Sequence, residues 1–279
     1  MIYLLACILC SLGWTVSYRL SLRSGCEPVG TMTGIGTASF LVALIISFTE
    51  RSVHFNSTAA LLGTCGGFSL YFAVFSYFHL LKGGVRLGIS WTIITLSMTI
   101  PTAGSILLWH ELPGPLQWLS LLLAVISIVF LGKFKEKGSS MGKRDILYLS
   151  AAFILSGAGA LIVKTLVSLN LEQHRNTYFI FLFATMLLIA VCVDIISHHL
   201  PSKRELLTGG AMGLAGIGNY WFIIRALRDV PGIVAFPFRT CGSILLTLIV
   251  SRIAWRERLG SLEIAGVVLA MVAIVLMSL

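Results

Sequence analysis

The sequence predicts an all-α integral membrane protein that crosses the bilayer ten times. Hydrophobic residues make up 57% of the chain and charged residues 11%, whereas soluble domains carry about 25% charged residues. The mean hydropathy is +0.95. Apolar runs recur at lengths near the 20 residues or so that span a hydrocarbon core of roughly 30 Å. A transmembrane β-barrel would instead show alternating polarity over strands of about ten residues.

An internal repeat is the second main observation, because residue i matches residue i+146 along much of the chain. The clearest pair is WHELPGPL (109–116) with WRERLGSL (255–262), which share W-x-E-x-x-G-x-L. A basic, polar linker at 133–144 separates the copies. Since a repeat fixes the architecture, the sequence predicts one five-helix repeat over residues 1–132 and a second over residues 145–279.

The first repeat is expected to hold helices at residues 2–20, 29–49, 58–81, 85–109 and 115–132. The first of these is apolar from Ile2 and lacks a basic leader or a cleavage site, so we expect a retained helix. The third carries Gly63 and Gly67, a spacing that lets helix backbones approach closely in lipid. Pro101 in the fourth is either a hinge or a packing kink. Glu111 is expected to stabilise the turn before the fifth.

The second repeat is expected to hold helices at residues 145–169, 175–197, 206–228, 231–253 and 260–278. Gly209 and Gly213 in the eighth helix match the glycine pair of the third, and Pro237 lies early in the ninth. An odd number of helices in each repeat makes the second copy enter the membrane from the opposite side. The sequence therefore predicts two inverted repeats around a central cavity, an arrangement typical of secondary transporters.

The positive charges predict the orientation. Fourteen Lys and Arg residues lie in loops on the side opposite the N-terminus and four lie in loops on the N-terminal side. Because cytoplasmic loops carry the excess of positive charge, we expect the linker in the cytoplasm and both termini outside, in a multi-pass protein of the inner or plasma membrane. The same placement accounts for the net charge of +9 and argues against a nucleic-acid partner.

Arg239 is the most informative single residue. It lies about eight residues, or roughly 12 Å, into its helix, where an ionisable group usually faces a cavity or the bundle interior. Ser243 shares its face, and Thr95 belongs to a threonine stripe in the repeat-equivalent fourth helix. These residues are expected to line a substrate cavity. The alternative is structural: the hydroxyls bond back to i−4 carbonyls, and Arg239 pairs with a carbonyl group.

Further candidates have polar tips within apolar segments. Aromatic residues of this kind are alternatively anchors at the membrane interface, and for Lys164 snorkelling to the surface would also be sufficient. The complete set of predicted substrate-binding residues is Arg239, Ser243, Trp14, Tyr71, Trp91, Thr95, Asn219, Tyr220 and Lys164.

Other chemistries lack the residues they need. No nucleotide-binding loop and no hydrolase or metalloprotease motif is present, so we expect neither an enzyme nor a cofactor or metal. The six cysteines are scattered, and Cys7 and Cys10 are expected to be apolar filler. All eleven Asp and Glu residues lie in loops or near helix ends. A buried cation without a buried carboxylate favours a substrate that carries a carboxylate or phosphate, or a zwitterion.

The stretches WHELPGPLQWLSLLLAVISIVFLG (109–132) and WRERLGSLEIAGVVLAMVAIVLMSL (255–279) resemble the drug/metabolite transporter (DMT) superfamily, and most of all its EamA branch. The resemblance implies a basket of helices around a cavity formed mainly by the first, third, fourth, sixth, eighth and ninth. It also implies transport of metabolites by alternating access. Members with this fold often keep both termini in the cytoplasm, contrary to the charge count. The membrane-embedded glutamate of the small multidrug branch has no counterpart here, because Trp14 occupies that depth.

The sequence therefore predicts a secondary active transporter for a small anionic or zwitterionic metabolite, such as an amino acid or organic acid. Its expected partners are that small molecule and the lipid bilayer, and the protein is expected to be a monomer or homodimer. Two alternatives remain: a lipid flippase or scramblase, and a multidrug or metabolite exporter of broad specificity.

Overall fold

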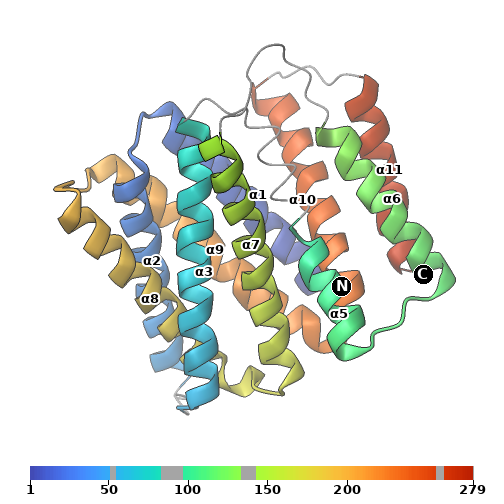
Figure 1. The fold of residues 1–279 in the computed structure, drawn as a ribbon, viewed down its shortest axis with the longest axis horizontal. Helices are drawn as coiled ribbons and strands as arrows, with labels where there is room; N and C mark the ends of the chain where they lie inside the picture. The colour runs from blue at the N-terminus through green and yellow to red at the C-terminus, as the bar shows by residue number, and fades with distance from the viewer. Residues whose placement is uncertain (51–54, 83–96, 133–142, 256–260, 279) are drawn as a thin grey trace.

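The computed structural model describes residues 1–50, 55–82, 97–132, 143–255 and 261–278, and every regular element in these ranges is helical. Figure 1 shows them as one bundle. In chain order the helices are α1 (Ile2–Arg23), α2 (Pro28–Thr49), α3 (Ser57–Lys82), α5 (Thr99–Trp109), α6 (Pro115–Gly132), α7 (Lys143–Ser168), the short 3-10 helix η1 (Glu172–His174), α8 (Arg175–Ile196), α9 (Lys203–Asp229), α10 (Gly232–Trp255) and α11 (Ser261–Ser278).

The expected all-helical fold is confirmed for the described residues, and the helix ends lie within three residues of the predicted limits except in the fourth. That helix was expected over residues 85–109, of which residues 83–96 lie outside the described part. Five of the described helices, α1, α2, α3, α7 and α8, are long and apolar enough to cross a membrane. Large apolar side chains such as Phe48 and Ile45 are exposed on the outside of the bundle, as expected where lipid is the solvent.

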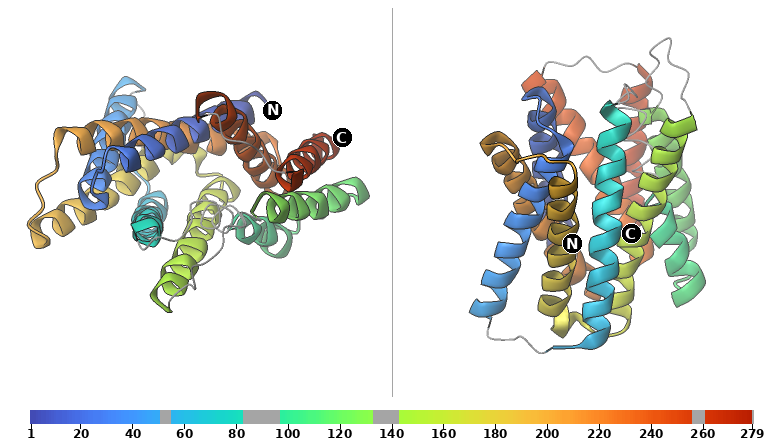
Figure 2. Two further views of the ribbon diagram at one scale, coloured as in Figure 1. Left: turned by 90° about the horizontal axis from the view of Figure 1, so that it is seen from above. Right: turned by 60° about the vertical axis from the view of Figure 1, so that its left-hand side comes forward.

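The helices form two outer pairs with a central group between them (Figures 1 and 2). At one end of the bundle α2 packs against α8, and at the other end α6 packs against α11. Between these pairs, α1 packs on α9 and α10, and α3 packs on α7. The outer pairs leave α1, α3, α7, α9 and α10 to surround the centre of the molecule.

Helices α2 and α8, which match at the shift of 146 residues, pack against each other in antiparallel directions. For α2 and α8, the Thr33 hydroxyl near the start of α2 donates to Asp194 near the end of α8. At the other end, Arg175 at the start of α8 donates two hydrogen bonds to Glu50 just after α2. The major contacts also exchange under the repeat, since α1 packs on α9 as α7 packs on α3, and α2 packs on α9 as α8 packs on α3.

Two glycine pairs set the closest of these contacts. A Cβ atom on Gly63 of α3 would lie 2.5 Å from the carbonyl oxygen of Tyr178 in α8. The repeat-equivalent pair behaves alike, because a Cβ on Gly213 of α9 would lie 2.6 Å from the carbonyl oxygen of Ile35 in α2. Since the obstructing atoms are backbone, no rotamer change makes room for a side chain. The prediction of tight helix packing at the G-x-x-x-G pairs is confirmed.

Candidate substrate cavity

A cavity of about 250 Å³ lies between α1, α3, α7, α9 and α10. These are the helices that the resemblance implied, apart from the fourth, which contributes Met98 just before α5. The residues that line the cavity are Ser11, Trp14, Tyr18, Leu70, Ala73, Val74, Tyr77, Met98, Leu155, Ser156, Gly159, Ala160, Val163, Ala215, Gly216, Asn219, Tyr220, Ile223, Phe236, Arg239, Thr240, Ser243 and Ile244.

Arg239 reaches the cavity from α10 and has only neutral hydrogen-bond partners in the described residues. Its Nη1 donates to Oδ1 of Asn219 at 2.7 Å, and its Nη2 lies 3.6 Å from the Met98 sulfur, a weak acceptor. A guanidinium has five N–H donors, so these two contacts leave donors available. The side chain is partly exposed to the cavity, which makes the remaining donors accessible to a ligand.

Asn219 holds this guanidinium in place by bridging α9 to α1. Its Nδ2 donates to the Cys7 carbonyl oxygen at 3.1 Å and to Ser11 Oγ at 2.6 Å. A backbone carbonyl accepts but cannot donate, so the amide nitrogen must face Cys7 and the amide oxygen must face Arg239. Cys7 Sγ also contacts the backbone carbonyl oxygen of Asn219 at 3.5 Å, which is a second contact between the same two helices. One amide therefore orders the meeting point of α1, α9 and α10.

Arg239 is the only charged residue of the cavity lining that the structure describes. No Asp or Glu of the described residues lies in the lining. A charge at this depth attracts a counterion, because its hydration is incomplete and the effective dielectric constant is well below that of water. An anionic group placed beside Arg239 would therefore be attracted to it.

The opposite wall, formed by α3 and α7, is lined mostly by small or apolar residues. Its lining residues are Leu70, Ala73, Val74, Tyr77, Leu155, Ser156, Gly159, Ala160 and Val163. Aromatic rings complete the polar side, where Trp14 packs against Gly216 and Tyr220 meets Phe183 edge to face. A ligand in this space would contact a cation on one side and hydrocarbon on the other.

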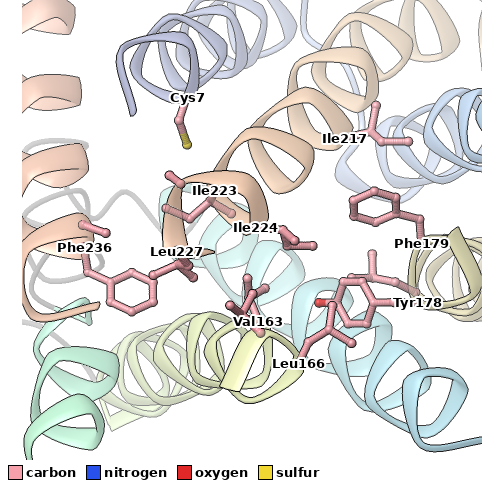
Figure 3. Close-up of a cluster of buried hydrophobic side chains, with 14 of the residues drawn as sticks. Cys7, Val163, Leu166, Tyr178, Phe179, Ile217, Ile223, Ile224, Leu227 and Phe236 are labelled. Atoms are coloured by element: carbon pink, nitrogen blue, oxygen red, sulfur yellow. The ribbon is translucent and has the colours of Figure 1, made fainter. Parts of the chain in front are cut away.

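An apolar cluster closes the end of the cavity where α7 and α9 end and α10 begins. Figure 3 shows Val163, Ile223 and Phe236 converging there from these three helices. Leu166 and Leu227, one turn farther along α7 and α9, are 0% and 4% exposed. The packing at this end of the cavity is therefore apolar and buried.

Lys164 lies next to this cluster and does not belong to the cavity lining. Its ammonium pairs with Oε1 of Glu111, while Oε2 of Glu111 accepts the Ile233 N–H at 3.1 Å, at the start of α10. Lys164 is only 5% exposed, so the alternative that it snorkels to the surface is wrong. The side chain of Glu111 therefore bonds to α7 and to the start of α10, and its expected role in the turn before α6 stays a prediction.

The structure brings five of the predicted site residues together and places two elsewhere. Those in the lining are Arg239, Ser243, Trp14, Asn219 and Tyr220. Tyr71 lies outside the lining, where it packs among aromatic rings of α3. Lys164 also lies outside the lining, beside Glu111. The remaining two, Trp91 and Thr95, lie outside the described residues.

Ser243 donates its hydroxyl to the Arg239 carbonyl at 2.6 Å, which is the i−4 bond named above as the alternative for such residues. Ser11 was not among the predicted residues, although its hydroxyl oxygen accepts a hydrogen bond from the side-chain amide of Asn219. Its signal was present in the sequence: Ser11, Trp14 and Tyr18 follow one another at spacings of three and four, so they share one face of a helix. All three line the cavity.

Within the described ranges, no group of three or more His, Cys, Asp or Glu residues is arranged to hold a metal ion. Residues 143–279 match the profile of the EamA-like transporter family. Through its second half, the chain belongs to that family. EamA-like proteins are transporters of the DMT type, so the protein is a multi-pass membrane transporter.

The fold of the whole chain resembles that of a solved structure. A solved crystal structure described only as "Crystal structure of protein" has a TM-score of 0.78 and 14% identity, and the alignment covers 99% of this chain and 94% of that one. At that identity the likeness shows the fold alone. A comparison with curated protein sequences gives no match.

Proposed function

We propose that this EamA-like protein is a secondary active transporter of a small anionic or zwitterionic metabolite. Arg239 binds the anionic group, and Asn219 positions Arg239. The observation that carries the proposal is a guanidinium that faces a cavity and whose bonds to the described residues go to an amide oxygen and a thioether. A buried cation left without a carboxylate is costly. A ligand that supplies one therefore binds with favourable free energy.

Alternating access would arise from ten membrane-spanning helices in two inverted five-helix repeats. Three contacts between repeat-equivalent helices support the inversion. The partners run antiparallel where α2 meets α8 and where Ser127, late in α6, donates to the Gly266 carbonyl, early in α11. Likewise the end of α5 meets the start of α10, where Gly232 packs against Ser105. Rocking of such repeats around a central site exposes the site to each side in turn.

We further propose that the chain carries out transport without enzymatic chemistry. The orientation follows from the charge count, in which fourteen cationic residues on the linker side and four on the other favour a cytoplasmic linker and termini outside. A cysteine introduced at Ser139 in the linker, in a variant whose six native cysteines are replaced, tests this orientation when intact and permeabilised cells are compared with a membrane-impermeant thiol reagent. Labelling from the outside would reverse it.

The test of the transport proposal uses purified protein in sealed liposomes. We expect saturable uptake of a radiolabelled organic acid, and an Arg239→Ala variant with roughly 100-fold lower transport efficiency, because a charge-assisted contact is lost. Arg239→Lys keeps the charge and should retain part of the activity. Ser156→Ala, on the opposite wall, is the matched control.

The proposal fails if Arg239→Ala is correctly folded and transports the acid with unchanged affinity. A lipid scramblase would instead move labelled phospholipid between leaflets of liposomes that hold no other substrate. That outcome would replace the metabolite proposal by the lipid-handling alternative.

A further inference from the structure

The polar wall of the cavity contains an amide at the position where a carboxylate would neutralise Arg239. We infer that Asn219 sets the charge selectivity of the site, and that the site selects a ligand with one net negative charge: a monocarboxylate with an apolar body, in preference to an amino-acid zwitterion. This inference rests on the proposed function and narrows its substrate class.

The first step is the identity of the Arg239 partner. Asn219 Oδ1 accepts from Nη1 at 2.7 Å. Asn and Asp have the same shape, so an aspartate oxygen at this position would also reach Nη1, while its second oxygen would turn away from the Cys7 carbonyl that the amide nitrogen now bonds. An aspartate there would form an internal ion pair and leave the cavity neutral. The amide positions the guanidinium without cancelling its charge, so the charge stays available for a ligand.

The second step is that other carboxylates of the described helices are held elsewhere. Glu111 pairs with Lys164 and Glu50 pairs with Arg175. Glu205 accepts the backbone N–H groups of Glu27 and Ser202. None of these carboxylates lies in the lining. The site therefore has one positive charge in the described residues, and a monoanion matches it.

The third step concerns the ammonium group of a zwitterion. If Arg239 holds the carboxylate of an α-amino acid, the ammonium lies within about 5 Å of the guanidinium, where two like charges repel. The described lining offers it no carboxylate. Asn219 Oδ1 already accepts from Arg239. Aromatic rings such as Trp14 offer a weaker attraction than a carboxylate does.

The fourth step is the apolar body of the ligand. Across from Arg239 the wall consists of α3 and α7 residues such as Ala73, Val74 and Leu155. Apolar surface of the ligand buried there contributes favourably to binding. A small inorganic anion such as phosphate would bring no such surface, so it should bind more weakly than a carboxylate with a hydrocarbon chain.

The experiment measures thermal stabilisation of the purified full-length protein at pH 7 by matched pairs of ligands. The pairs are butanoate with 2-aminobutanoate, hexanoate with 2-aminohexanoate, and 3-phenylpropanoate with phenylalanine, and hexylamine and inorganic phosphate serve as charge controls. Ligands that bind the native state raise the unfolding temperature. We expect the acid of at least one pair to reach half of its maximal effect at a concentration about tenfold lower than its amino derivative does.

Asn219→Asp should abolish the preference. Its carboxylate pairs with Arg239, so the half-maximal concentration of the acid should rise about 100-fold while that of the amino acid rises much less. Ser11→Ala removes one hydrogen bond of Asn219 and keeps the charge, so it should keep the preference. If the aspartate variant does not fold, the ligand pairs on the wild-type protein decide the question without it.

Each outcome distinguishes the inference from the proposed function. Amino acids that stabilise the wild-type protein as well as their parent acids overturn the charge inference and leave the transporter proposal standing. Stabilisation by hexylamine alone, or by none of the ligands, counts against both. An Asn219→Asp variant that folds and still prefers the acid overturns the role of Asn219.

Discussion

The two walls of the cavity are built from repeat-equivalent positions and differ in chemistry. Asn219 and Tyr220 of α9 correspond to Ala73 and Val74 of α3 at the shift of 146 residues, and all four line the cavity. Trp14 of α1 likewise corresponds to Ala160 of α7, and both lie in the lining. The residues at these matched positions make one wall polar and the other apolar.

The comparison indicates where rigidity and chemistry reside in this transporter. Helices α3 and α9 both fasten their glycine faces to a neighbouring backbone, α3 to α8 and α9 to α2. Only α9 also carries an amide toward a cation. The packing faces of α3 and α9 therefore have the same role, and their cavity faces differ.

The largest effect on stability is expected at the glycine contacts, which occur at matching positions of α3 and α9. Gly67→Ala places a Cβ against the Leu182 carbonyl oxygen, which is backbone and cannot give way, and should lower the free energy of unfolding by about 2–4 kcal/mol. Gly159→Ala is the matched control, because the nearest atom to its Cβ is Ser69 Oγ at 3.7 Å. Thermal denaturation in detergent measures both. Equal stability of the two variants would show that the glycine contact is not close.

A smaller effect is expected where the copies differ. Asn219→Ala removes the oxygen partner of Arg239 and the donor to Ser11, and should weaken binding of an organic acid about tenfold. Adding Ala73→Asn, the repeat-equivalent change, should not restore affinity, because Cys7 and Ser11 that hold the native amide lie on α1. Titration of ligand-induced stabilisation measures this. Full recovery in the double variant would mean that the walls are interchangeable.

The smallest effect lies outside both walls, at the antiparallel contact of α2 and α8. Burial alone would raise the pKa of the Glu50 carboxyl, but hydrogen bonds from Asn176 and Arg175 and the charges of Arg175 and Arg225 lower it overall. A lowered pKa contributes stability above the unfolded-state value of about 4.3 and loses it as pH falls through the folded-state value. Because both side chains are partly exposed, Glu50→Gln should cost only about 0.5–1 kcal/mol at pH 7.

The pH dependence of that cost provides the check. The difference in unfolding temperature between wild type and Glu50→Gln should be constant between pH 6 and 8, where Glu50 is ionised, and should shrink below about pH 4.3. A difference that grows on acidification would contradict the sign of the pKa shift.

The sequence by itself determined the helical fold class and the depth of the central cation. Apolar runs of membrane length predict helices, because in lipid a single segment satisfies all its backbone hydrogen bonds only as a helix. The other solution is a closed β-barrel, in which strands bond to one another. An arginine deep in such a run predicts a cavity because it is too costly in lipid. The close helix packing at the glycine pairs that begin with Gly63 and Gly209 could likewise be predicted, since the same spacing occurs in both halves.

Only the tertiary structure decided which polar residues meet. Ser11 and Asn219 are 208 positions apart. No local sequence pattern predicts that the Asn219 amide donates a hydrogen bond to the Ser11 hydroxyl. Lys164 has the sequence features of a cavity residue, but it pairs with Glu111, 53 positions away. Helical periodicity fixes the face on which a side chain lies. The packing of helices from distant parts of the chain decides whether that face meets a ligand, a partner charge or a dry core.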